Sequence, residues 1–207
     1  MSALAAEAEG PRPEWAGAVL WFTGLPGAGK STVAKAVADE LTRRGLNPVW
    51  LQMDARRKHY TPRPLYTAKE REAAYRMFAE EAAALAEEGR VVLMDGTAPL
   101  RSMRDHARGL VERFAEVHLR CGVATAMRRE SARPEGLVMA GLYAKAVKRK
   151  ATGQKFDGLG QVVGVDVPFE EDPRAELVLD AEKLSVEQMR DAVLKRFAGW
   201  FVDGEER

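Results

Sequence analysis

Short apolar runs alternate with amphipathic segments along most of this chain. Residues 18–23 (AVLWFT) form an apolar run closed by a glycine, which is the pattern expected of a strand buried on both faces. Apolar residues then recur every three or four positions over 31–44, which predicts a helix that Gly45 ends. Four further strands are predicted, at 48–53, 91–94, 115–121 and 176–180.

Helical patterns fill the gaps between these strands. The longest covers 68–88 and is rich in Ala and Glu, two strong helix formers. The last begins with Ser185 and Gln188 at the spacing of a capping box. This last helix covers 185–198, and the other helices are predicted at 102–113 and 124–131. This alternation predicts an α/β fold with a doubly wound, five-stranded parallel sheet flanked by helices.

Two segments have no clean period. Residues 55–66 are basic and interrupted by two prolines, so we expect a loop there. Residues 133–171 are rich in Gly, Lys and Val, and we expect a mobile lid that contains a short helix at 142–151. The predicted organisation is a flexible tail over 1–16 followed by a single domain over 17–207.

A phosphate-binding loop follows the first predicted strand, because residues 24–31 read GLPGAGKS and match G-x-x-x-x-G-K-S. Glycines let backbone N–H groups turn toward phosphate oxygens, and the next helix adds its positive N-terminus. Lys30 should reach the β- and γ-phosphates of ATP, and the Ser31 hydroxyl should bind Mg²⁺. The motif therefore predicts a P-loop NTPase fold. The residues expected to contact ATP are Gly24, Leu25, Pro26, Gly27, Ala28, Gly29, Lys30, Ser31 and Thr32.

Two acids follow the next two strands. Asp54 comes directly after the second predicted strand and Asp95 after the third, so both would face the loop in a doubly wound sheet. Phosphoryl transfer needs a partner for Mg²⁺ and a group that orients or deprotonates the acceptor hydroxyl. Asp54 is the candidate base or water-mediated Mg²⁺ anchor, and Asp95 is the alternative for either role. Each could instead serve as a helix N-cap or a turn residue.

Basic residues gather near the same strand ends. They favour a small anionic acceptor, with a solvated basic surface as the alternative. They are Arg56, Arg57, Lys58, His59, Arg63, Arg71, Arg101 and Arg104. A second basic group stands in or before the predicted lid, whose closure would bring positive charge to the ATP phosphates. From that group we assign Arg129 to ATP binding and Lys145 to substrate binding.

The composition narrows the class of function. With 46% hydrophobic residues, 30% charged residues and a net charge of +1, the 207-residue chain is neither disordered nor a general polyanion binder, which disfavours a nucleic-acid partner. The first ten residues lack the features of a secretion signal, and no apolar run nears the roughly 20 residues that span a bilayer. We therefore expect a cytoplasmic protein. Cys121 is the single cysteine, which excludes an internal disulfide and a Cys-based zinc cluster.

Three motifs resemble those of the adenylylsulfate kinase (APS kinase) family. They are WFTGL at 21–25, running into the phosphate loop, GLYAKA at 141–146 and GVDVPFE at 164–170. The resemblance extends from Val19 to Phe197. Enzymes of this family move the γ-phosphoryl group of MgATP to the ribose 3′-hydroxyl of adenylylsulfate, and they often form homodimers.

The resemblance also implies roles for single residues. Asp54 matches the second acid of the family motif D-G-D-N-x-R, and Arg57 matches its arginine. Arg71 matches the arginine of a later D-R pair, while Pro99 and Arg101 match the last part of S-P-[YF]-R. The resemblance therefore implies that these three arginines hold a small anionic nucleotide.

The chain departs from the family motifs at several positions. Gln52 and Met53 replace the first D-G of D-G-D-N, and Asp95 and Gly96 replace part of an apolar strand end. Val162 stands where the family has a phenylalanine that stacks on the nucleotide base. Three other functions therefore stay open: a kinase of another small metabolite, an ATP-binding module without transfer activity, and a kinase of nucleic-acid ends, which the near-neutral charge disfavours.

Overall fold

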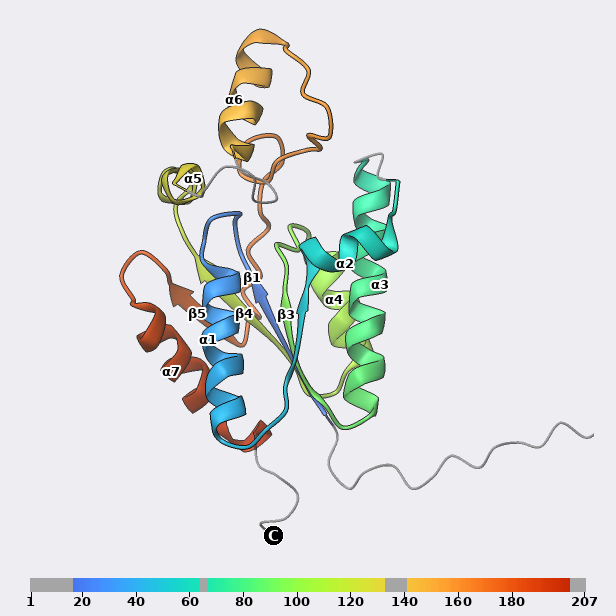
Figure 1. Ribbon diagram of the computed structural model, residues 1–207, viewed down its shortest axis with the longest axis vertical. Coiled ribbons are helices and arrows are strands. Elements are labelled where there is room, and N and C mark those ends of the chain that lie inside the picture. Colours follow the sequence, from blue (N-terminus) through green and yellow to red (C-terminus); the bar gives the residue numbers. More distant parts are fainter. Residues whose placement is uncertain (1–16, 64–66, 133–140, 202–207) are drawn as a thin grey trace, which may run out of the picture.

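The protein folds around a five-stranded parallel sheet with helices on both faces (Figure 1). A computed structural model describes residues 17–63, 67–132 and 141–201, so the predicted tail and the start of the predicted lid lie outside the described residues. The strand order is β2-β3-β1-β4-β5 and every neighbouring pair is parallel. The strands are Ala18–Thr23 (β1), Val49–Gln52 (β2), Val91–Asp95 (β3), Phe114–Arg120 (β4) and Leu177–Asp180 (β5).

The predicted helices are present, with ends that differ from the predicted ones by at most three residues. They are Lys30–Arg43 (α1), Ala68–Glu87 (α3), Arg101–Leu110 (α4), Val123–Ser131 (α5), Leu142–Thr152 (α6) and Val186–Arg196 (α7), followed by a 3₁₀ turn at Ala198–Trp200. The capping box at the start of α7 is formed, since Ser185 Oγ accepts from the Gln188 amide and the Gln188 side chain accepts from the Ser185 amide. Among the described residues, no helix is both long and apolar enough to cross a bilayer.

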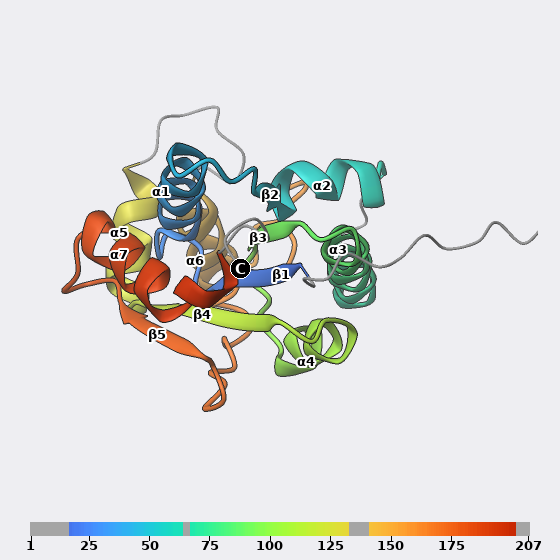
Figure 2. The ribbon, with the colours of Figure 1, turned by 90° about the horizontal axis from the view of Figure 1, so that it is seen from below.

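Two hydrophobic cores explain the uninterrupted apolar run of β1. Leu20 and Phe22 belong to the core with α1 and α7, whereas Val19 and Trp21 belong to the core with α3 and α4. Successive side chains of a strand point to opposite faces, so both faces of a central strand must be apolar. Figure 2 shows α1 and α7 on one side of the sheet and α3 and α4 on the other. The doubly wound architecture is thereby confirmed.

Helix α2 corrects the prediction of a loop over 55–66. Residues Met53–Tyr60 form a helix directly after β2, and Asp54 lies in its first turn. Arg56 and Tyr60, one helical turn apart, both bind the Glu81 carboxylate on α3, with Arg56 Nε donating to Oε2 at 3.0 Å. These contacts between α2 and α3 stabilise a helix that the local basic composition does not predict.

Arg104 is buried in the structure, although we expected it to border the cleft. Its side chain is fully buried on α4 and forms an ion pair with Glu116 of β4 at 3.0 Å. Its guanidinium also donates to the carbonyl oxygens of Ala98 and Glu170. Glu116 in turn accepts from the Thr23 hydroxyl at 2.7 Å, just before the phosphate loop. Arg104 therefore has a structural role, because it ties three segments around the loop together.

His118 lies beside this cluster on β4. Its ring stacks on Phe169 with the centroids 4.9 Å apart, and Nδ1 lies 3.4 Å from the Thr23 hydroxyl. Burial, reinforced by the positive charges of Arg104, Arg120 and Lys30, lowers the pKa of His118 from 6.5 to about 4. The imidazole is consequently neutral in the folded protein at physiological pH.

We predict that His118 makes the fold sensitive to mild acid. Between about pH 6.5 and 4 the unfolded chain protonates this imidazole and the folded chain does not, so the free energy of unfolding falls as pH falls, by about 2–3 kcal/mol. Urea titrations at about pH 7.5 and about pH 4.5 measure this loss. His118→Phe, which keeps the ring stack, should show a smaller loss than wild type. His59→Gln, at an exposed histidine, is the control, and an unchanged loss in His118→Phe would contradict the assignment.

Candidate active site

The phosphate loop leaves β1 at the centre of the sheet and enters α1. Gly24, Gly27 and Gly29 all have positive φ values, of 130°, 86° and 100°, which L side chains rarely adopt. Lys30 opens α1 and folds back across the loop, with Nζ donating to the Leu25 carbonyl oxygen at 3.0 Å. The loop and the positive end of α1 therefore have the geometry of a phosphate cradle.

Close packing holds this loop in place. A Cβ on Gly24 would lie 2.5 Å from the Leu119 carbonyl oxygen, and a Cβ on Gly27 would overlap the Ala126 carbonyl oxygen of α5. From the other direction, the Tyr143 hydroxyl of α6 donates to the Pro26 carbonyl oxygen at 2.9 Å. The loop is thus fixed between β4, α5 and the helix of the predicted lid.

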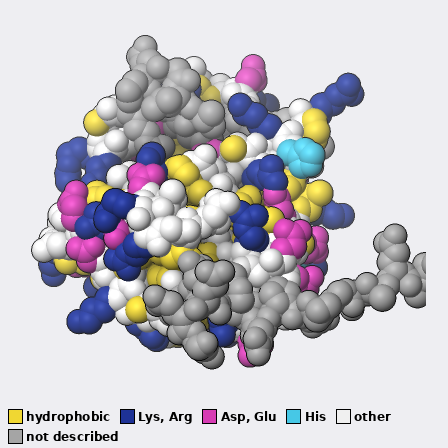
Figure 3. All heavy atoms as spheres, turned by 60° about the horizontal axis from the view of Figure 1, so that its bottom comes forward, with side chains coloured by type: hydrophobic (Ala, Val, Ile, Leu, Met, Phe, Trp, Pro, Cys, Tyr) yellow, Lys and Arg dark blue, Asp and Glu magenta, His cyan; other side chains and the backbone are white. Residues whose placement is uncertain are grey.

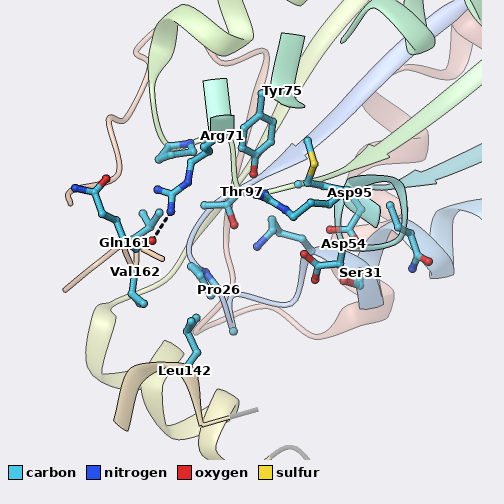
Figure 4. A pocket seen from close by; sticks show the side chains of 18 residues that line it. Pro26, Ser31, Asp54, Arg71, Tyr75, Asp95, Thr97, Leu142, Gln161 and Val162 are labelled. Atoms are coloured by element: carbon cyan, nitrogen blue, oxygen red, sulfur yellow. Dashed lines mark hydrogen bonds between the residues drawn. The ribbon is translucent and has the colours of Figure 1, made fainter. Parts of the chain in front are cut away.

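A cavity opens beside the loop at the carboxyl ends of β1, β2 and β3 (Figure 4). Asp54, Asp95 and Ser31 lie together on one side of it, and Arg71 lies across from them beside Gln161. The predicted residues that line the cavity are Pro26, Gly27, Lys30, Ser31, Asp54, Arg57, Arg71, Asp95 and Pro99. The fold thereby brings anion-binding groups, two carboxylates and a hydroxyl from distant parts of the sequence into one cavity.

Different elements position the two carboxylates. Asp54 and Arg57 are three residues apart on α2, so both reach the cavity from one face of that helix. Asp95 is the last residue of β3 and only 7% exposed. The following Gly96 is held by Trp21, whose indole Nε1 donates to the Gly96 carbonyl oxygen at 3.2 Å. Asp95 is therefore fixed by the sheet, and Asp54 by the packing of α2 on α3.

The oxygen groups fit a magnesium ion bound together with a nucleotide. Among the described residues, no group of three or more His, Cys, Asp or Glu side chains could hold a metal ion. Mg²⁺ commonly uses only one or two carboxylates and completes its shell with water and substrate phosphates. Ser31, Asp54 and Asp95 carry oxygen atoms of this kind and line the cavity beside the phosphate loop.

Arg71 of α3 spans the cavity toward the segment after α6. Its guanidinium donates to the Gln161 carbonyl oxygen (Figure 4). Burial lowers the pKa of Arg71, opposed by Tyr75 and Asp166, yet the guanidinium stays charged because its ordinary pKa lies far above neutral. A half-buried cation thus faces the cavity, where an anionic ligand could pair with it.

Of the predicted site residues beyond the phosphate loop, three lie outside this cavity. Arg101 donates its amide to Glu170 Oε2 at 2.8 Å, and its guanidinium Nε lies 4.0 Å from the same carboxylate. Arg129 donates to the Ala181 carbonyl oxygen at 2.8 Å. Lys145 is exposed on α6. Arg101 therefore contacts the Glu170 carboxylate and Arg129 the Ala181 carbonyl oxygen, outside the cavity.

Other lining residues were not predicted from the sequence. They are Gln52, Met53, Tyr75, Gly96, Thr97, Leu142, Gln161, Val162 and Val163. Tyr75 could have been found, because it lies one helical turn after Arg71 and shares its face of α3. Val162 could also have been found, because it stands where the family motif has a phenylalanine, whereas Gln161 and Val163 carry no such signal, since the segment after α6 has no regular period.

Comparison with known proteins identifies the family. The model of the adenylylsulphate kinase family matches residues 16–180. This chain belongs to that family. A probable adenylyl-sulfate kinase of Archaeoglobus fulgidus is 32% identical over 165 residues, covering 80% of this chain and 96% of the relative. An adenylyl-sulfate kinase of Shewanella amazonensis is 35% identical over 169 residues, covering 81% and 77%.

A solved structure of an APS kinase agrees with the membership of this chain in the adenylylsulphate kinase family. The APS kinase of Mycobacterium tuberculosis, determined in complex with AMPPNP and APS, superposes with a TM-score of 0.74 at 26% identity. The match covers 89% of this chain and 99% of the other. The P-loop kinase fold predicted from the sequence is thereby confirmed.

We predict that two glycines of the loop differ in their tolerance of a side chain. Gly27→Ala and Gly29→Ala both impose an unfavourable φ, but only Gly27→Ala also creates an overlap with Ala126, because nothing lies within 4 Å of a Cβ on Gly29. Gly27→Ala should therefore lower the Tm further than Gly29→Ala, by roughly 3–6 °C. Thermal unfolding of the two variants measures the difference. Equal losses in the two variants would contradict the packing argument.

Proposed function

We propose that this protein transfers the γ-phosphoryl group of ATP to the 3′-hydroxyl of adenylylsulfate. The observation that carries the proposal is the single cavity in which the phosphate loop, two carboxylates and two arginines meet. Membership of the adenylylsulphate kinase family supports both substrates. Phosphoryl transfer depends on positioning and on charge neutralisation, and this cavity supplies groups for each.

The nucleotide side of the reaction uses the phosphate loop. Backbone N–H groups of 24–31 would bind the β- and γ-phosphate oxygens, and Lys30 would neutralise charge that develops on the bridging oxygen. Mg²⁺, when bound, neutralises further charge on these phosphates, with Ser31 and a carboxylate as its protein partners. The bond between the γ-phosphorus and the bridging oxygen then breaks as the acceptor oxygen bonds to that phosphorus.

The acceptor side of the cavity lies between α2 and α3. Arg57 and Arg71 would pair with the anionic groups of adenylylsulfate, and Pro99 would border it. Asp54, on the same helix as Arg57, would orient the 3′-hydroxyl and accept its proton. The acceptor side of the cavity would thus use Asp54 and Arg57 from α2 and Arg71 from α3.

We also propose that the segment around α6 closes over the nucleotide as a lid. Tyr143 contacts the phosphate loop and Gln161 contacts Arg71, so this segment already touches both sides of the cavity. Closure would exclude water from the transferring phosphoryl group. Cytoplasmic localisation and assembly into a homodimer stay predictions for this chain.

A second candidate function is the phosphorylation of another small anionic metabolite in the same cavity. Val162, buried in the cavity wall, favours it, because an aliphatic side chain replaces the aromatic platform of the family motif. On the face shown in Figure 3, the described Lys and Arg side chains intermingle with Asp and Glu and do not gather into one basic patch.

ADP release by the purified protein with MgATP, with and without adenylylsulfate, tests the proposed function. We expect release that depends on adenylylsulfate, and a loss of roughly 10²-fold or more in Lys30→Ala, because the cation on the transferring phosphates is gone. Release stimulated only by other anionic acceptors would support the second candidate. Bound ATP without acceptor-dependent release would identify a nucleotide-binding module, and full activity in Lys30→Ala would contradict the phosphate-loop assignment.

Arg71→Ala should affect the binding of adenylylsulfate and not the binding of ATP. We expect the KM for adenylylsulfate to rise by about 10- to 100-fold while the KM for ATP stays unchanged, since Arg71 faces the acceptor side. Initial rates with each substrate varied in turn measure the two constants. Arg76→Ala, at an exposed arginine of the same helix, is the control. An equal rise in both constants would exclude a role specific to the acceptor.

A further inference from the structure

Gln52 and Asp95 occupy matching places on neighbouring strands. They are register partners in the parallel pair of β2 and β3, at the carboxyl end of both strands. Partners in register on parallel strands present their side chains on the same face of the sheet. Both residues line the candidate active-site cavity, so a carboxylate on either strand would face the same space.

The sequence around these two positions shows an exchange. The family motif D-G-D-N has an acid and a glycine where this chain has Gln52 and Met53. An acid and a glycine occur instead on the neighbouring strand, at Asp95 and Gly96. An acid followed by a glycine is therefore present at the end of β3, whereas the family motif has this pair at the end of the neighbouring strand β2.

Packing after the two strands fits this arrangement. Met53 is only 3% exposed, and a Cβ on Gly96 would lie 3.2 Å from Met53 Cβ and 3.3 Å from Tyr75 Cε1. A side chain at position 96 would therefore need Met53 and Tyr75 to shift. A glycine directly after β3 thus suits a neighbour that carries a side chain at position 53.

We propose that Asp95 supplies the carboxylate that the family motif places at position 52, so that an acid–glycine pair has been exchanged between β2 and β3. The inference rests on the proposed function and assigns Asp95 a role distinct from that of Asp54. Asp54 remains the group that orients the acceptor hydroxyl. Asp95 accepts hydrogen bonds from the water shell of the Mg²⁺ bound with the nucleotide.

The sheet order explains why Asp95 suits this role. Strand β3 lies directly beside β1, whereas β2 lies one strand further out, so Asp95 is nearer the phosphate loop by one strand spacing of about 4.8 Å. Asp95 is also the register partner of Phe22, two residues before Gly24, and the Gly96 amide donates to the Phe22 carbonyl oxygen at 3.3 Å. Asp95 is fixed by pairing with two strands and lies on the same side of the cavity as Ser31, where it could face a metal bound with the nucleotide (Figure 4).

A reciprocal exchange tests this inference. Asp95→Asn should lower kcat by about 10- to 100-fold and weaken the Mg²⁺ dependence of ADP affinity, a range typical of groups that orient a metal's ligands. Adding Gln52→Asp to this variant should recover most of both losses, because it returns the carboxylate to the same face of the sheet. Adding Gln52→Asn is the matched control and should recover neither. Titration calorimetry of ADP with and without Mg²⁺ gives a readout that needs no acceptor.

The outcomes separate this inference from the proposed function. Wild-type kcat and Mg²⁺ dependence in Asp95→Asn, or equal behaviour of the Gln52→Asp and Gln52→Asn double variants, would overturn the exchange. If Asp95→Asn does not fold, as judged by thermal unfolding, Asp95→Ser replaces it in the same comparison. Absence of adenylylsulfate-dependent ADP release in wild type would contradict the proposed function alone, because the Mg²⁺–ADP titrations still decide the role of Asp95.

Discussion

The buried ion pair between Arg104 and Glu116 is the interaction on which the geometry of the cavity depends. A charge buried without a partner is strongly destabilising, so the guanidinium must find acceptors in the segments around it. It finds them in Glu116, Ala98 and Glu170, and Glu116 also binds Thr23. One side chain on α4 thereby joins the loop after β3, the segment after α6 and the end of β1.

The active-site cavity divides its charges according to this framework. The acids lie toward the phosphate loop, where a metal and ATP phosphates would balance them, and Arg71 lies across the cavity on α3 beside Gln161. This separation suits a reaction between two anions, because each substrate meets opposite charge before the reacting groups approach. It also explains why a chain with a net charge of +1 can hold a strongly anionic pair of ligands.

The relation between Gln52 and Asp95 illustrates how neighbouring strands of a parallel sheet can present a functional side chain to the same cavity. The carboxyl ends of parallel strands meet along one edge, so a functional group can move to a neighbouring strand and still reach the same cavity. Such a move changes the spacing of a motif along the chain while preserving its place in space. Motif comparison alone would therefore count the change at Gln52 as a lost acid.

By itself, the sequence determined the order of strands and helices and the phosphate loop, because hydrophobic period and glycine spacing are local properties. It also indicated Asp54, Asp95, Arg57 and Arg71, which the structure brings to one cavity. Only the tertiary structure decided that 53–60 is a helix, that Arg104 is buried, and that Arg101 binds Glu170 instead of lining the cavity. Each of these depends on partners 12 to 69 residues away in sequence, namely Glu116, Glu81 and Glu170, and contacts of this kind leave no local pattern.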